Sequence, residues 1–303
     1  MEYRYRAVGR LEHEALSVDI ERNRYLEVKN AKATCLYALE LEEKLALLLD
    51  NFAEYEVELL RLAESSLIWP NRWFADFMHQ RLLLDRRLVN LLTACRLYLD
   101  QSDHLVSTIF GKPSLELGAV KAFKNDLHST RRGYRLMEAV RNHVQHAGTA
   151  IHSVTYGSSL SHDHAYVEFT IAPSARVKDF AENPKFSRKV LAELREGKEA
   201  VDLRGPLRDY VSCLISIHEQ VRETIHSTIS DARDLYEAAV AEFSVVDGEA
   251  VKFPQLLEVR QDGTVSEETA LVGDFLVHHD RLLERNVTNK DLRHSTASNS
   301  DRD

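Results

Sequence analysis

Residues 114–148 read SLELGAVKAFKNDLHSTRRGYRLMEAVRNHVQHAG. Their apolar side chains recur at spacings of three, four and seven residues, which is typical of the buried face of a helix. Ser114 is a natural N-cap, Glu116 suits the positive end of the helix dipole, and Gly148 provides a left-handed stop. The stretch therefore predicts one long helix with a single buried face, in which Gly133 is the only weak position.

The last turns of this predicted helix carry an unusual polar face. At about 100° per residue, Asn142, Gln145 and His146 point nearly away from the buried stripe. Arg141 lies on the flank of the same face. A merely solvated helix face is usually a mixture of Lys and Glu, whereas this one combines two amides, an imidazole and a guanidinium. This combination of side chains indicates a binding or catalytic site.

Leucine-rich helical patterns on both sides of this stretch predict a bundle. The first runs from about Lys29 to Glu64 and the second from Arg72 to Asp100. Trp69-Pro70-Asn71 separates them, with Asn71 as the N-cap of the second helix. A fourth long helix is predicted from Pro206 to about Phe243. Long consecutive helices joined by short turns favour antiparallel packing, so the fold class is a mainly α bundle with small β-hairpin insertions.

Strand patterns occur around the predicted bundle. Alternation of apolar and polar residues predicts a short hairpin within residues 1–28 and further β-hairpins at residues 151–171 and 251–272, the last turning at Asp262-Gly263. A short helix is predicted from Asp274 to Arg285. The expected organisation is an N-terminal extension with short strands (1–28), a helical bundle with a hairpin insertion near 150–172 (29–245), a C-terminal hairpin and short helix (246–285), and a disordered tail (286–303).

Composition limits the kinds of partner. The 303 residues carry 39 Lys and Arg against 48 Asp and Glu, a formal charge of −9 that repels nucleic acid in bulk. Residues 121–146 reverse this balance, with six basic residues against two acidic ones, which suits a phosphate site in one place. The three cysteines lack paired spacing and predict buried thiols. With no signal peptide or membrane span in the sequence, we expect a soluble cytoplasmic protein without a membrane partner.

Arg141-Asn142-x-x-x-His146 resembles the Arg-x4-6-His motif of the HEPN superfamily (higher eukaryotes and prokaryotes nucleotide-binding), including its habit of a polar residue after the Arg. The resemblance extends to the helical scaffold over residues 30–150 and 205–245. It implies an HEPN-like bundle and a metal-independent endoribonuclease that needs no cofactor. It also implies a toxin or antiphage defence effector, held in check by a regulatory protein partner.

The residue types fit this chemistry. RNA carries its own nucleophile, the ribose 2′-hydroxyl, so the protein has to supply only proton transfer and a cation for the phosphate charge. An imidazole such as that of His146 exchanges protons close to neutral pH. Arg141 offers a fork of donors to phosphate oxygens, and Asn142 is placed to position the imidazole or the phosphate. The expected products are a 2′,3′-cyclic phosphate and a 5′-hydroxyl. The candidate RNA contacts are Arg131, Arg132, Arg135 and His143.

The motif's geometry predicts a homodimer. Five residues of helix place Arg141 and His146 roughly 140° apart in rotation, so one copy cannot readily close both around a single phosphate. A twofold dimer would bring two such helix ends around one cleft. The expected active site is therefore composite, with RNA as substrate.

Other interpretations remain open at the level of sequence. An Arg and a His near a helix C-terminus suit the helix dipole without any function. The acidic total charge favours a non-catalytic HEPN-like helical module that binds a protein. A metal-dependent hydrolase is a third possibility, since several histidines and an aspartate follow the motif, but their spacing fits no known ligand set and we predict no metal site. These residues are His152, His162, Asp163 and His164. Trp69 and Trp73 suit ligand stacking, although burial statistics favour packing.

Overall fold

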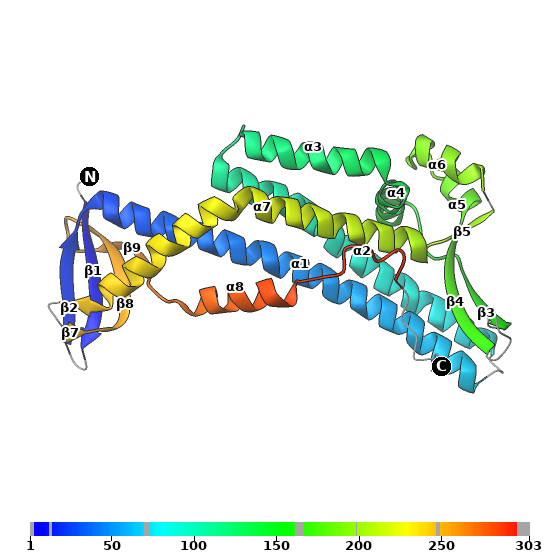
Figure 1. Cartoon of the computed structure of the whole chain (residues 1–303), viewed down its shortest axis with the longest axis horizontal. Helices are drawn as coiled ribbons and strands as arrows, with labels where there is room; N and C mark the ends of the chain where they lie inside the picture. Colours follow the sequence, from blue (N-terminus) through cyan, green and yellow to red (C-terminus); the bar gives the residue numbers. More distant parts are fainter. Residues whose placement is uncertain are drawn as a thin grey trace. The chain divides into compact units, whose positions relative to one another are not determined.

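The computed structural model describes residues 3–11, 14–69, 73–160, 167–197, 199–246 and 249–295. The described chain is mainly helical, as predicted (Figure 1). It forms two compact units: unit 1 contains the described residues of 1–43 and 222–287, and unit 2 contains those of 44–221 and 288–303. None of the helices in the described part of the chain has the length and apolar content that crossing a membrane requires.

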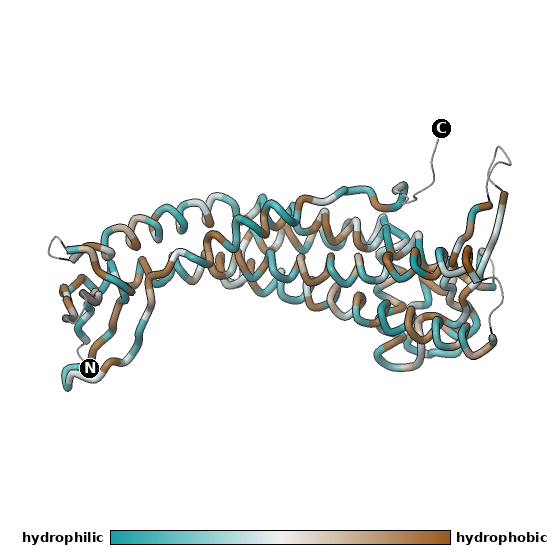
Figure 2. Tube along the Cα trace, turned by 90° about the horizontal axis from the view of Figure 1, so that it is seen from below, coloured by the Kyte–Doolittle hydropathy of each residue, from teal (hydrophilic) through white to brown (hydrophobic). Residues whose placement is uncertain are grey.

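Unit 2 is a helical bundle that carries the motif. It contains the end of α1 (Arg22–Ile68), α2 (Phe74–Phe110), α3 (Leu115–Thr130), α4 (Arg132–His146), α5 (Val177–Ala181), α6 (Arg188–Arg195) and the start of α7 (Arg204–Phe243). Hydrophobic and hydrophilic residues alternate in short patches along these helices (Figure 2), as expected for amphipathic helices with one buried face. α1 and α2 run antiparallel and are joined by an ion pair between Glu54 and Arg87. α2 continues ten residues beyond the predicted end at Asp100, because Leu105 and Val106 are also buried.

The predicted single helix over 114–148 is wrong, because the chain breaks at Arg131. This residue has an extended backbone (φ −99°, ψ 112°) between α3 and α4. Asp209 of α7 accepts a hydrogen bond from the Gly133 amide at 3.1 Å, and its carboxylate also binds the Arg131 guanidinium. The carboxylate thus satisfies the first turn of a new helix and starts α4 there. As a result α4 is seen end-on in Figure 1 while α3 lies lengthwise.

A three-stranded antiparallel sheet follows α4 in unit 2. Its strands are β3 (Ser153–Leu160), β4 (Val167–Arg176) and β5 (Ala200–Asp202), in the order β3-β4-β5. β3 and β4 form the hairpin predicted for residues 151–171, with Ser153 opposite Ser174. His162, Asp163 and His164, the histidines and aspartate considered as metal ligands in its turn, lie outside the described residues.

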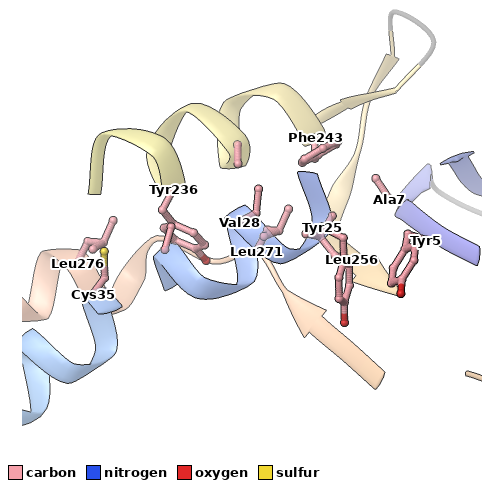
Figure 3. Close-up of a cluster of buried hydrophobic side chains, with 12 residues drawn as sticks. Tyr5, Ala7, Tyr25, Val28, Cys35, Tyr236, Phe243, Leu256, Leu271 and Leu276 are labelled. Carbon is pink, nitrogen blue, oxygen red and sulfur yellow. The ribbon is translucent and has the colours of Figure 1, made fainter. Parts of the chain in front are cut away.

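Unit 1 is a sheet covered by helices. Its sheet is antiparallel, in the order β2-β1-β8-β9. The strands are β1 (Tyr3–Leu11), β2 (Glu14–Ile20), β8 (Lys252–Arg260) and β9 (Val265–Ala270), with a separate pair β6 (Val245–Val246) and β7 (Glu249–Ala250). Both predicted terminal hairpins are therefore present, but β1 also pairs with β8 and joins them in one sheet. Tyr25, Val28 and Tyr236 from α1 and α7 pack with Tyr5 and Leu256 of the sheet (Figure 3).

The end of the chain departs from its prediction. α8 (Asp274–Arg285) occupies the predicted range. Residues 286–295 were predicted to belong to a disordered tail, but in the structure they make specific hydrogen bonds with the rest of the chain. Asn286 is buried and donates a hydrogen bond to the Glu42 carboxylate at 2.8 Å, and the Leu292 amide donates to Ser212 at 3.1 Å. Side-chain hydrogen bonds hold this segment without any apolar periodicity. Residues 296–303 lie outside the described residues.

The packing predicted for Trp69 and Trp73 is also wrong. Both side chains are exposed, at 59% and 83%. They flank the connection between α1 and α2, where the helix pair ends. The N-cap predicted at Asn71 lies outside the described residues.

Candidate active site at the end of helix α4

The motif occupies the last turns of α4. Asn142, Gln145 and His146 are exposed, as the periodicity predicts. The helix axis ends at His146, and the Ala147 amide donates a capping hydrogen bond to the His143 carbonyl at 2.8 Å. An amide and an imidazole one turn apart therefore face solvent at the C-terminal end of the helix.

Arg141 is largely buried and held in place by residues of its own helix. Its side chain is 13% exposed. One terminal nitrogen, Nη1, donates to Gln145 Oε1 at 2.8 Å, and Nη2 lies 3.6 Å from Glu138 Oε2. Nε is buried and has no hydrogen-bond partner within the described part of the chain. The guanidinium is thus oriented by two neighbours on its own helix, and the donor without a partner, Nε, is closed to solvent.

Glu138 anchors this arrangement from one turn earlier on α4. Its carboxylate accepts a hydrogen bond from the Tyr210 hydroxyl and lies 3.8 Å from Arg96 Nη1. Burial raises the pKa of the Tyr210 hydroxyl well above its usual value, so the hydroxyl remains a donor at neutral pH. Glu138 therefore ties the motif helix to α7 and α2 while it partly neutralises Arg141.

His143 lies in the core, so its prediction as an RNA contact is wrong. The residue is 4% exposed, and its ring meets Phe180 edge-on at 5.0 Å between centroids. Asn183 Nδ2 donates to its Nδ1 at 3.1 Å, which leaves the ring proton on Nε2. Burial lowers the pKa of His143, so the ring is neutral at pH 7.

Gly148 was predicted to end the helix in a left-handed conformation, and this prediction is wrong. The residue instead faces the His143 ring. Its φ is outside the left-handed region, and a Cβ atom there would lie 3.2 Å from His143 Nε2. The glycine therefore permits a close approach of the chain to His143 as it leaves α4.

Most of the predicted basic contacts have internal partners. Arg131 binds Asp209, and Arg135 donates to the carbonyls of His128 and Ser129 at the end of α3. Arg135 also pairs with Glu193 of α6 at 3.1 Å. These two arginines stabilise the break between α3 and α4. Only Arg132 is exposed among the three predicted arginines, with one hydrogen bond to the Glu193 carbonyl.

The chain after the motif is fixed against α2. Asp85 accepts hydrogen bonds from the Ala150 and Ile151 amides at 2.9 and 2.8 Å, and Arg81 donates to the Ile151 carbonyl at 2.9 Å. His152 Nε2 then lies 3.3 Å from Asp179 of α5. Within the described residues, no three His, Cys, Asp or Glu side chains gather as a metal site.

Three residues that hold the motif helix in place, Glu138, Asp209 and Tyr210, were not predicted from the sequence. Glu138 precedes Arg141 by one helical turn, so its contact was open to prediction from spacing alone. Asp209 and Tyr210 come from α7, more than 70 residues away in the chain, and carry no local signal.

Comparison of the chain with protein-family models, curated proteins and solved structures gives no match.

Proposed function

We propose that this chain is a metal-independent endoribonuclease of the HEPN type, which cleaves RNA at a site shared by two copies. Its setting would be that of a toxin or antiphage defence effector under the control of a regulatory protein. The observation that carries the proposal is the end of α4, where exposed Asn142 and His146 lie beside Arg141, whose guanidinium is held in place by Gln145 and Glu138.

The proposed reaction needs only these groups. His146 of one copy accepts the proton of the ribose 2′-hydroxyl, and the 2′-oxygen attacks the phosphorus. Arg141 donates hydrogen bonds to the non-bridging oxygens as negative charge develops there. The bond to the 5′-oxygen breaks, and His146 of the other copy gives that oxygen a proton. The products are a 2′,3′-cyclic phosphate and a 5′-hydroxyl.

Two further features support the proposal. Glu138, Gln145 and the buried His143 fix the last turns of α4, and such preorganisation is what electrostatic catalysis requires. Arg132 is an exposed cation on the same helix and remains a candidate RNA contact.

The proposal predicts RNA cleavage in the presence of a chelator. Purified chain incubated with total RNA and excess EDTA is expected to produce fragments, because no step uses a metal. End-group analysis should find 2′,3′-cyclic phosphate and 5′-hydroxyl ends. Fragments with 5′-phosphate ends, or cleavage that stops with EDTA, would point to a metal-dependent hydrolase. Intact RNA at every protein concentration would contradict the proposal.

A second candidate function is a non-catalytic helical module that binds a protein. The formal charge of −9 and the partial neutralisation of Arg141 by Glu138 favour it. Intact RNA in the same assay is the result expected of such a module.

A further inference from the structure

Two buried histidines lie side by side behind the end of α4. His143 belongs to the last turn of α4, and His152 immediately precedes β3. Their ring centroids are 6.4 Å apart, and the His152 side chain is 9% exposed. Both rings meet Phe180 of α5 edge-on, at 5.0 and 5.9 Å between centroids. The proposed reaction uses neither imidazole.

Hydrogen bonds fix the protonation state of His143. Asn183 lies in the connection between α5 and α6, and its Oδ1 accepts a hydrogen bond from the Lys185 amide at 3.0 Å. This bond sets the orientation of the Asn183 side chain, because the flipped amide would turn its NH2 group toward another donor. Nδ2 therefore donates to His143 Nδ1, 3.1 Å away. Since Nδ1 can accept this bond only without a proton, the contact requires a neutral ring.

His152 is held in the same way. Its Nδ1 accepts a hydrogen bond from the Arg176 backbone amide at 3.4 Å, so a proton on Nδ1 would again meet a donor. Nε2 lies 3.3 Å from Asp179 Oδ2. Both histidines therefore present Nδ1 as an acceptor to an N–H group that is fixed in place.

The charges around the pair do not favour two cations. Asp179 of α5 is already paired with the Arg176 guanidinium at 2.6 Å, and Arg176 itself adds positive charge beside His152. Asp85 of α2 also faces His152, but its carboxylate accepts hydrogen bonds from two backbone amides after α4. Burial lowers the pKa of both histidines, against the opposing effect of Asp179. Both rings are therefore neutral at pH 7.

We infer that His143 and His152 form a proton-operated latch, which holds the α5–α6 connection against the end of α4 only while both rings are neutral. Protonation turns two hydrogen bonds into contacts between donors, and it places two cations 6.4 Å apart between ring centroids. The connection then leaves the last turns of α4, which also carry Asn142 and His146. As a control of RNA cleavage the latch rests on the proposed function, but its opening can be measured without RNA.

The pH range of the latch follows from the direction of the two pKa shifts. Because the folded chain favours the neutral rings, the latch is fully formed above the ordinary imidazole pKa of about 6.5 and weakens as the pH falls below it. Hydrogen exchange of the full chain, corrected for the intrinsic rate, measures its opening. Protection of residues 177–195 is expected to fall at least about tenfold between pH 7.5 and pH 5.5. Protection of α3 serves as the internal control and should stay nearly constant.

His143→Asn combined with His152→Asn removes the two protonation sites. Asparagine offers Oδ1 close to the position of Nδ1 and cannot take up a proton, so the folded double variant should keep the same protection at both pH values. The matched control is His226→Asn, which removes an exposed histidine of α7. It should lose protection of residues 177–195 in acid as wild type does.

Asn183→Asp tests the latch without removing a ring. The aspartate keeps an acceptor for the Lys185 amide and gives His143 a carboxylate, which favours the protonated imidazole. This variant should therefore lose less protection in acid than wild type does, and it decides the matter if the double variant does not fold.

Equal protection of residues 177–195 in wild type at pH 7.5 and pH 5.5 would overturn the inference. So would an acid loss that persists unchanged in the folded double variant or in Asn183→Asp. A latch that opens in a chain that never cleaves RNA would refute only the enzymatic proposal. RNA cleavage by a chain whose residues 177–195 stay protected in acid would refute only the latch.

Discussion

Replacing His146 with alanine is expected to lower the rate of RNA cleavage by at least about 100-fold, because general acid–base catalysis contributes roughly 10²–10⁴. Arg141→Ala should cause a loss of similar size, as removal of a donor to a developing oxyanion costs about 10²–10³. Single-turnover assays with end-labelled RNA measure both effects. Full cleavage by either folded variant would remove that residue from the mechanism.

Two controls separate chemistry from folding. His226 is an exposed histidine of α7, distant from the motif in the sequence, and His226→Ala should cleave as wild type does. Arg141 is largely buried, so its alanine variant also needs an unfolding curve. Arg141→Gln keeps most of the side chain and a donor to Gln145 while it removes the charge. It should remain folded and inactive.

Replacing Asp209 with alanine is expected to lower the free energy of unfolding by about 3 kcal/mol. Asp209 is 7% exposed, and its loss leaves the Arg131 guanidinium and the Gly133 amide without their shared acceptor. Since this carboxylate starts α4 and positions the motif, RNA cleavage should fall as well. Urea unfolding followed by circular dichroism measures the change in stability.

Asp100 provides the matched control for this substitution. It pairs with Arg96 one turn away on α2 and its side chain is 55% exposed, so Asp100→Ala should cost less than about 1 kcal/mol. Asp209→Asn retains an acceptor for the Gly133 amide and should fall between the two. If Asp209→Ala is no more destabilising than Asp100→Ala, the carboxylate does not hold the helix break.

The exposure of the motif residues could be predicted from a local sequence pattern, whereas the role of Asp209 could not. The exposure of Asn142 and His146 follows from helical periodicity within one segment, so the sequence was sufficient. The break at Arg131 depends on a carboxylate 78 residues away. The burial of His143 likewise depends on Asn183 and Phe180, 40 and 37 positions later. On α4 alone, His143 lies at the edge of the apolar stripe, and only tertiary contacts decide its environment.

In the sheet of unit 1, too, the local pairings were predictable from the sequence and the long-range pairing was not. Each terminal hairpin has a local signal in alternating residues or in Asp262-Gly263, and both form as predicted. The pairing of β1 with β8 joins residues some 250 positions apart, for which neither hairpin carries a signal. Trp69 and Trp73 were predicted to pack because of their residue type, yet the helix pair ends there and leaves them exposed.

The most direct test of a site shared by two copies is to mix the wild-type chain with a growing excess of the His146→Ala chain. The reaction uses one imidazole from each copy, so a mixed dimer, which retains only one, should be inactive. Subunit exchange is verified by mass spectrometry, and cleavage is measured at a constant amount of wild-type chain with labelled RNA in excess. The shared site predicts that cleavage falls steadily as the His146→Ala chain draws wild-type chains into mixed dimers. Cleavage that stays at the wild-type level in a verified population of mixed dimers would contradict it.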